Sequence, residues 1–172
     1  MKSILQLSLR LLDRISEPRA VRAHCDIPCG IYDPHLAQVA ALTCVRMNQL
    51  IRDLEAPTLD ADADARKTFL NSYARYVTVK EEHAELVKRE VRIIWADYFK
   101  PEHLEKYPDL HASVFNIMKL ASTVRQQVNL AASEQLLAEV SKFAEAFWDT
   151  KGVKTQRQGS NQAAGGEYVV PA

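Results

Sequence analysis

The sequence predicts an all-α protein, built as an antiparallel four-helix bundle with a short hook at its N-terminus. Apolar residues recur at helical spacing along most of the chain, and short connections join four such segments. The 172 residues, 47% of them hydrophobic, are enough for one domain with a substantial core. We expect a leader at 1–23, the hook at 24–34, the bundle at 35–151 and a tail at 152–172.

The first two helices are marked by their boundaries. Asp33-Pro34 predicts a helix start, because Asp is favoured as an N-cap and Pro at the first helical position. Ala56-Pro57 ends this helix. The second helix is long, ends at Lys100-Pro101 and carries two apolar stripes, so it packs against more than one neighbour. Three acidic residues suit the positive end of its dipole: Asp60, Asp62 and Asp64.

The rest of the chain predicts two further helices and a tail. Residues 101–108 form a turn-rich connector. The third helix directs these residues inward: Leu110, Val114, Ile117, Ala121, Val124 and Val128. The fourth helix also directs apolar residues inward: Leu136, Leu137, Val140, Phe143, Phe147 and Trp148. Gly152 ends it, and the tail up to Ala172, rich in Gln, Gly, Ser and Asn, is expected to be disordered.

Charge is unevenly placed, although the formal net charge is zero. Residues 1–23 carry a net charge of +3 and the remaining residues a net charge of −3. No basic cluster is interleaved with aromatic residues, so we expect no nucleic-acid partner. No apolar run approaches the ~20 residues of a membrane span, so we expect no membrane association.

The leader, residues 1–23, is an amphipathic segment that we expect to be removed during maturation. It lacks the uninterrupted apolar stretch of about 7–15 residues that a secretory signal needs. The three cysteines of the chain are an odd number and form no disulfide framework. Reduced thiols are typical of the cytoplasm, and a cytoplasmic location is expected.

The hook, HCDIPCGIYDP, places one histidine and two thiols within six residues, His24 to Cys29. Pro28 and Gly30 allow a tight turn that brings the two sulfur atoms to one point. Mixed nitrogen and sulfur donors favour zinc, copper or nickel. The absence of a second Cys/His pair argues against a structural zinc site, and the absence of CxxC argues against a thioredoxin-like redox pair. The segment is therefore predicted to be a metal-binding hook.

Cleavage before His24 would complete the donor set. A free α-amine has a pKa of roughly 7.7–8.0 and can yield its proton to a metal near neutrality. This amine, the amide nitrogen of Cys25 and the sulfurs of Cys25 and Cys29 can form a plane, with the imidazole in an axial position. Such a set suits nickel(II) or copper(II), and its anionic donors stabilise a higher oxidation state. The full-length chain is therefore interpreted as an inactive precursor.

The hook resembles the N-terminal nickel-binding hook of the nickel superoxide dismutase family. Two further blocks resemble the same family: WADYFKPEHLEKYPDLH at 95–111 and FWDTK at 147–151. The resemblance implies a precursor trimmed by a maturation peptidase, and a four-helix bundle that assembles as a homohexamer. It also implies an antioxidant oxidoreductase that converts superoxide to dioxygen and hydrogen peroxide, cycling one nickel ion per subunit between +2 and +3.

The same resemblance implies the roles of the hook residues. His24 supplies the amine and the axial imidazole. Cys25 supplies an amide nitrogen and one thiolate, and Cys29 supplies the second thiolate. Tyr32 lies over the open face of the metal and gates small anions.

Around the hook, the resemblance implies supporting residues. Asp26 and Pro28 shape the hook, Pro28 through a cis bond, and Tyr98 and Lys100 lie near it from the body of the bundle. The chain departs from the best-studied members at two positions on the helices.

The first departure is Ala40, where those members carry a glutamate that orients the axial histidine. The second is His83, where they carry an arginine near the same imidazole; Arg75 does match a family arginine. Loss of such supporting groups can lower metal affinity or activity ~10–100-fold. His83 can substitute for the arginine through water.

Two other functions stay open at this level. The chain can be a non-catalytic nickel or copper carrier or sensor that uses the same hook. It can also be a helical interaction module whose cysteines are incidental. Cys44 is expected to be a buried, inert thiol, because it stands among apolar residues on a helix.

Overall fold

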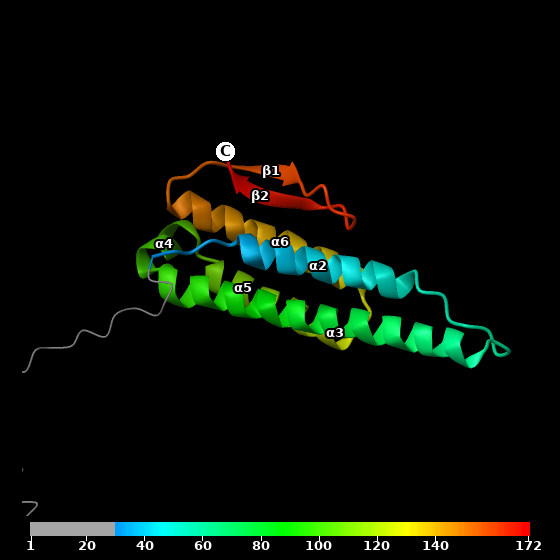
Figure 1. Cartoon of the computed structure of the whole chain (residues 1–172). Helices are drawn as coiled ribbons and strands as arrows, with labels where there is room; N and C mark the ends of the chain where they lie inside the picture. Colours follow the sequence, from blue (N-terminus) through cyan, green and yellow to red (C-terminus); the bar gives the residue numbers. More distant parts are fainter. Residues whose placement is uncertain (1–29) are drawn as a thin grey trace, which may run out of the picture.

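The computed structural model describes residues 30–172, and within this range it is an antiparallel bundle of four long helices (Figure 1). They are α2 (His35–Arg52), α3 (Ala63–Ile93), α5 (Leu110–Gln126) and α6 (Leu130–Thr150). α2 packs against α3 and α6, and α5 packs against the same two helices. The four-helix bundle predicted from the sequence is confirmed.

The predicted helix starts follow from local capping. α2 begins at His35, one residue later than predicted, with Pro34 as its N-cap, and the backbone N–H of His35 donates to Oδ1 of Asp33 at 2.7 Å. Asp62 caps α3 by accepting from the N–H of Ala65 at 2.7 Å. These side chains satisfy backbone donors that a helix leaves unpaired at its N-terminus.

The end of α3 differs from the continuous helix that was expected. The chain forms one turn of π-helix, η1 (Ile94–Tyr98), closed by the N–H of Phe99 donating to the carbonyl of Ile94 at 3.3 Å. Pro101 then begins a short helix, α4 (Pro101–Lys106), where a turn-rich connector was predicted. Proline suits this position because it has no N–H to leave unpaired. Single π turns are often found at functional sites, and this one carries Tyr98.

The core lies between the four helices and is built from the predicted apolar faces. On α2 small residues allow close helix approach, and the side chains of Ala37, Ala40 and Cys44 are wholly buried. Val128, expected to point inward, is exposed because it follows the end of α5. No helix within residues 30–172 is both long enough and apolar enough to cross a membrane.

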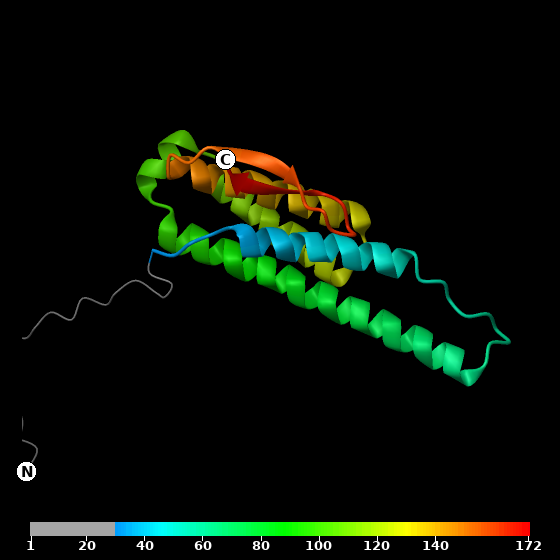
Figure 2. The same cartoon turned by 45° about the horizontal axis from the view of Figure 1, so that its top comes forward.

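Residues 152–172 do not form the disordered tail that was predicted. β1 (Thr155–Gly159) and β2 (Glu167–Pro171) pair as an antiparallel hairpin. The hairpin lies over α2 and α6 (Figures 1 and 2). The polar composition is that of β1 and the connecting loop, whereas β2 supplies the apolar contact through Val169, which is buried.

The N-terminal half of α3 extends beyond the other helices (Figures 1 and 2). No side chain within residues 63–79 is buried, and Leu70 and Tyr73 are exposed there. This half of the helix therefore contributes no buried side chain to the core within the described chain.

Candidate metal centre

Five predicted site residues lie outside the described residues: His24, Cys25, Asp26, Pro28 and Cys29. The structure shows the base from which they extend, the segment between Gly30 and the start of α2. Gly30 has φ +90°, a left-handed conformation that favours glycine. The turn expected at this residue is therefore present.

Tyr32 lies half-buried against an aromatic cluster at one end of the bundle, and its ring centroid is 5.9 Å from that of Tyr98. Tyr98 packs at 4.7 Å against Phe147 and at 5.5 Å against His103. We call these four residues the aromatic cluster. It joins the segment before α2 to η1, α4 and α6, and it places Tyr98 beside Tyr32.

A hydrogen bond fixes Tyr98 in this cluster. The hydroxyls of Tyr98 and Thr150 lie 2.9 Å apart, and the Thr150 hydroxyl donates to the carbonyl of Phe147 at 2.7 Å. Because the Thr150 proton is committed, Tyr98 is the donor in the first bond. The ring that supports Tyr32 is thus held by packing and by a bond to α6.

Two lysines place positive charge at this end of the bundle. Nζ of Lys151 lies 4.9 Å from the ring centroid of Phe147 and 5.5 Å from that of Tyr98, within cation–π range. Lys100 is exposed and lines a hollow of about 320 Å³ with Trp95 and other residues. Such charges raise the local concentration of small anions. Lys151 was not singled out from the sequence, although it closes the block 147–151.

A polar group on the same end braces α4. Asp149 accepts a hydrogen bond from the hydroxyl of Tyr107 and lies 2.5 Å from Nζ of Lys106. These two bonds lower the pKa of Asp149. Burial, followed by the bond to Asp149, raises the pKa of Tyr107 to about 12. The group ties the segment after η1 to the end of α6.

His83 and Arg75 are not brought together with Tyr32. His83 is half-buried, and its Nδ1 donates to the carbonyl of Val79 at 2.8 Å. Arg75 is exposed. They precede Tyr98 by 15 and 23 residues, roughly 22 and 34 Å along a helix. Their role at the hook stays a prediction.

The departure at Ala40 has a clear structural setting. Its side chain is wholly buried in the core on α2. It therefore offers no polar atom toward a metal-bound imidazole, and support of the kind a glutamate gives is absent at this position.

The described part of the chain supplies no metal site of its own. Within residues 30–172, no three His, Cys, Asp or Glu side chains gather into a metal-binding group. Cys44 is buried, and burial raises its pKa to about 12, so it stays a neutral thiol and a poor ligand. The imidazole and thiols predicted as ligands lie before Gly30, and such donors fit nickel.

A four-helix bundle preceded by a short histidine- and cysteine-rich hook defines a helical metalloprotein with soft donors. Residues 19–151 match the family model of nickel-containing superoxide dismutase, and the chain belongs to this family. It is 33% identical over 142 residues to the superoxide dismutase [Ni] of Streptomyces coelicolor, covering 82% of this chain and 98% of the relative. It is 32% identical, with the same shares covered, to that of Streptomyces seoulensis.

Solved structures agree with this assignment. A native structure of nickel superoxide dismutase matches with a TM-score of 0.63 and 33% identity, covering 74% of this chain and 99% of that chain. An apo structure matches with a TM-score of 0.61 and 30% identity, covering 72% and 99%. The family match ends at Lys151, so the hairpin of β1 and β2 lies outside it.

Proposed function

We propose that this chain, trimmed before His24, is a nickel superoxide dismutase that converts two superoxide ions and two protons to dioxygen and hydrogen peroxide. The observation that carries this proposal is the hook HCDIPC directly before Gly30, in a chain that belongs to the family. Membership favours an oxidoreductase over a non-catalytic nickel or copper carrier or sensor. It equally disfavours a helical interaction module with incidental cysteines.

Three residues would hold the nickel. His24 would supply its amine and imidazole, Cys25 its amide nitrogen and thiolate, and Cys29 its thiolate, while Asp26 and Pro28 shape the segment. Bound nickel supplies a one-electron couple, which thiolate donors bring within reach of superoxide. The amine, the Cys25 amide and both thiols would lose protons on binding, so we expect nickel affinity to rise with pH.

Tyr32, Lys100 and Lys151 are proposed to control the approach of superoxide. Support comes from the position of Tyr32, three residues after Cys29 and packed against Tyr98. The two lysines offer local positive charge, although residues 24–172 carry a net charge of −3. Tyr32 is proposed to admit small anions and to exclude larger reductants.

Three further features belong to the proposal: removal of residues 1–23 by a maturation peptidase, a homohexamer, and a cytoplasmic location. The leader lacks the apolar stretch of a secretory signal. Exposed apolar side chains on α3 and α5 support self-association: Leu70 is 62% exposed and Phe115 is 66% exposed. Light scattering after gel filtration tests the assembly, and a monomeric mass would contradict the hexamer.

The experiment compares three chains that begin at His24, each incubated with one equivalent of nickel. They carry the native sequence, Cys25→Ser with Cys29→Ser, or Cys44→Ser as the matched control. Superoxide decay is followed by stopped-flow absorbance. We expect acceleration by the native chain and by the control, and none by the double variant. A nickel-loaded native chain that does not accelerate the decay would contradict the proposal.

A further inference from the structure

We propose that the C-terminal hairpin is a strap that holds the first turn of α2 and thereby positions the base of the metal hook, with Gln38 as its positioning residue. The inference rests on the proposed function of the hook. It concerns residues 155–171, which lie beyond the family match at 19–151. The strap is therefore a property of this chain that family membership does not assign.

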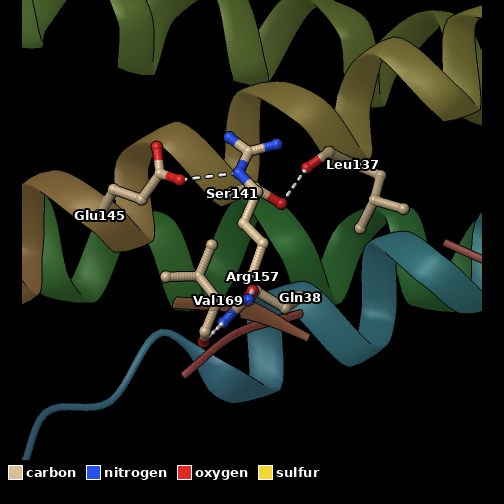
Figure 3. A network of polar contacts seen from close by, with 6 residues as sticks. All are labelled: Gln38, Leu137, Ser141, Glu145, Arg157 and Val169. Carbon is tan, nitrogen blue, oxygen red and sulfur yellow. Dashed lines mark hydrogen bonds and ion pairs between the residues drawn. The ribbon is translucent and has the colours of Figure 1, made fainter. Parts of the chain in front are cut away.

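The central contact is a pair of hydrogen bonds between Gln38 and Val169. Nε2 of Gln38 donates to the carbonyl of Val169 at 3.0 Å, and the N–H of Val169 donates to Oε1 of Gln38 at 2.6 Å (Figure 3). Both residues are buried. The side-chain amide thus takes the place of a neighbouring strand along the outer edge of β2.

The register of the hairpin explains why Val169 is available. Val169 lies opposite Arg157 in the β1–β2 ladder. In antiparallel pairs, alternate residues direct both backbone groups away from the partner strand. Both groups of Val169 are used by Gln38, so β2 is joined to β1 on one edge and to α2 on the other.

Further contacts tie the hairpin to both helices. The ring of Tyr168 packs edge-on against His35, the first residue of α2, with centroids 5.3 Å apart. On the other strand, Nε of Arg157 donates to Oε1 of Glu145 on α6 at 2.8 Å (Figure 3). The hairpin therefore links the start of α2 to the last turns of α6.

The consequence concerns the few residues between the hook and the bundle. Tyr32 is held by Tyr98 of the aromatic cluster, and the turn that follows it, His35 to Gln38, is held by the hairpin. Burying Gln38 without Val169 would leave its amide unpaired, which is costly. Loss of the strap should therefore loosen the first turn of α2 and the base of the hook.

α2 offers a matched control at its other end. Nε2 of Gln49 donates to the carbonyl of Ala164 in the hairpin loop at 3.1 Å. Gln38→Leu and Gln49→Leu each remove a glutamine that binds the hairpin backbone. Only Gln38→Leu does so beside the hook.

The first arm uses the metal-free, full-length chain and follows hydrogen exchange of amides 38–41, which report opening of the first turn of α2. We expect about 10-fold faster exchange in Gln38→Leu, as two buried hydrogen bonds are lost, and native exchange in Gln49→Leu. Equal exchange in the native chain and both variants would overturn the strap. If Gln38→Leu does not fold, Tyr168→Leu, which removes the His35 contact, carries the same test.

The second arm uses chains that begin at His24 and measures nickel affinity and the electron-resonance spectrum of the oxidised form. We expect affinity ~10–100-fold weaker in Gln38→Leu, with altered anisotropy of the signal, and native values in Gln49→Leu. A lower melting temperature in both variants with unchanged affinity and spectrum would show a merely structural role and overturn the inference. If the native chain binds no nickel, the proposed function fails, while the first arm still decides the strap.

Discussion

Among single residues, Cys44 shows how environment separates one thiol from the others. It is wholly buried on α2, and burial raises its pKa to about 12, more than the positive charge of Lys80 lowers it. A thiol in this state is neither a nucleophile nor a metal ligand at neutral pH. Cys25 and Cys29 lie outside the described residues, and the proposal makes them deprotonated ligands.

This contrast predicts the pattern of alkylation. Iodoacetamide at pH 8 should modify Cys25 and Cys29 in the metal-free chain and leave Cys44 unmodified until denaturant is added. Peptide mass spectrometry reads the three sites separately. Modification of Cys44 in the native chain at the rate of the unfolded chain would contradict its burial.

The raised pKa of Cys44 also predicts a pH dependence of stability. The folded thiol stays neutral up to about pH 12, whereas the unfolded thiol ionises near its ordinary pKa of about 8.5. The stabilisation of the folded state that this thiol contributes is therefore complete below the pKa of the unfolded thiol. It is lost as the pH rises toward 12. Cys44→Ala should lack this alkaline loss in urea titrations between pH 8 and 10.5, compared with the native chain.

The sequence predicted single positions well where the signal was local. α2 begins at His35, within one residue of the start predicted from Asp33-Pro34, and Asp62 caps α3, because a cap depends on residues within one turn. Gln38 was missed, since its partner Val169 stands 131 residues away. The one local sign of this contact was that Gln38, a polar residue, stands on the apolar face of its helix.

At the scale of elements, the hairpin is the feature that the sequence did not predict. The composition of this segment resembles that of a disordered tail. The two strands form here because the segment makes long-range contacts with α2 and α6. The run of strand-favouring residues Tyr168-Val169-Val170 and the glycine pair Gly165-Gly166 were the local signals. The π turn η1 was equally hidden, because the apolar period passes through it unchanged.

The two glycines predict how tightly the hairpin packs. Both have φ near +70°, at +72° for Gly165 and +75° for Gly166. A Cβ at Gly166 would meet Leu42 at 3.0 Å and Leu137 at 3.1 Å, whereas a Cβ at Gly165 would meet nothing within 4 Å. Gly166→Ala thus adds tight contacts with two leucine side chains to the backbone strain that both positions share.

We expect Gly165→Ala to cost about 1–2 kcal/mol of unfolding free energy from the left-handed backbone. Gly166→Ala should cost about 1–3 kcal/mol more, from overpacking against α2 and α6. Urea titration of both variants measures the difference. Equal losses would show that the hairpin does not pack on the bundle as described.

For the whole molecule, the bundle concentrates features at one end: the start of α2, the aromatic cluster and two lysines. The residues of the hook predicted a metal site, the family resemblance placed Tyr98 near it, and the structure adds Lys151 beside Tyr98. The separation of His83 and Arg75 from Tyr98 could be counted along the predicted helix, whereas the packing of Tyr32 against Tyr98 depends on the tertiary structure.

The lysines predict a dependence on salt. With the nickel-loaded chain, Lys100→Gln combined with Lys151→Gln should slow superoxide decay a few-fold at low ionic strength. The control is Lys154→Gln, which replaces an exposed lysine beyond α6. Because the Debye length falls to about 3 Å at 1 M salt, the difference should vanish there. A loss that persists at high salt would show damage to the site and not lost attraction.

The central claim is that trimming before His24 creates the nickel site. The most direct measurement is electron resonance after nickel addition and oxidation, on two chains that differ by one residue, beginning at His24 or at Ala23. We predict one nickel per chain and a rhombic signal with an axial nitrogen only for the chain that begins at His24. The same signal and nickel content in the chain that begins at Ala23 would contradict it.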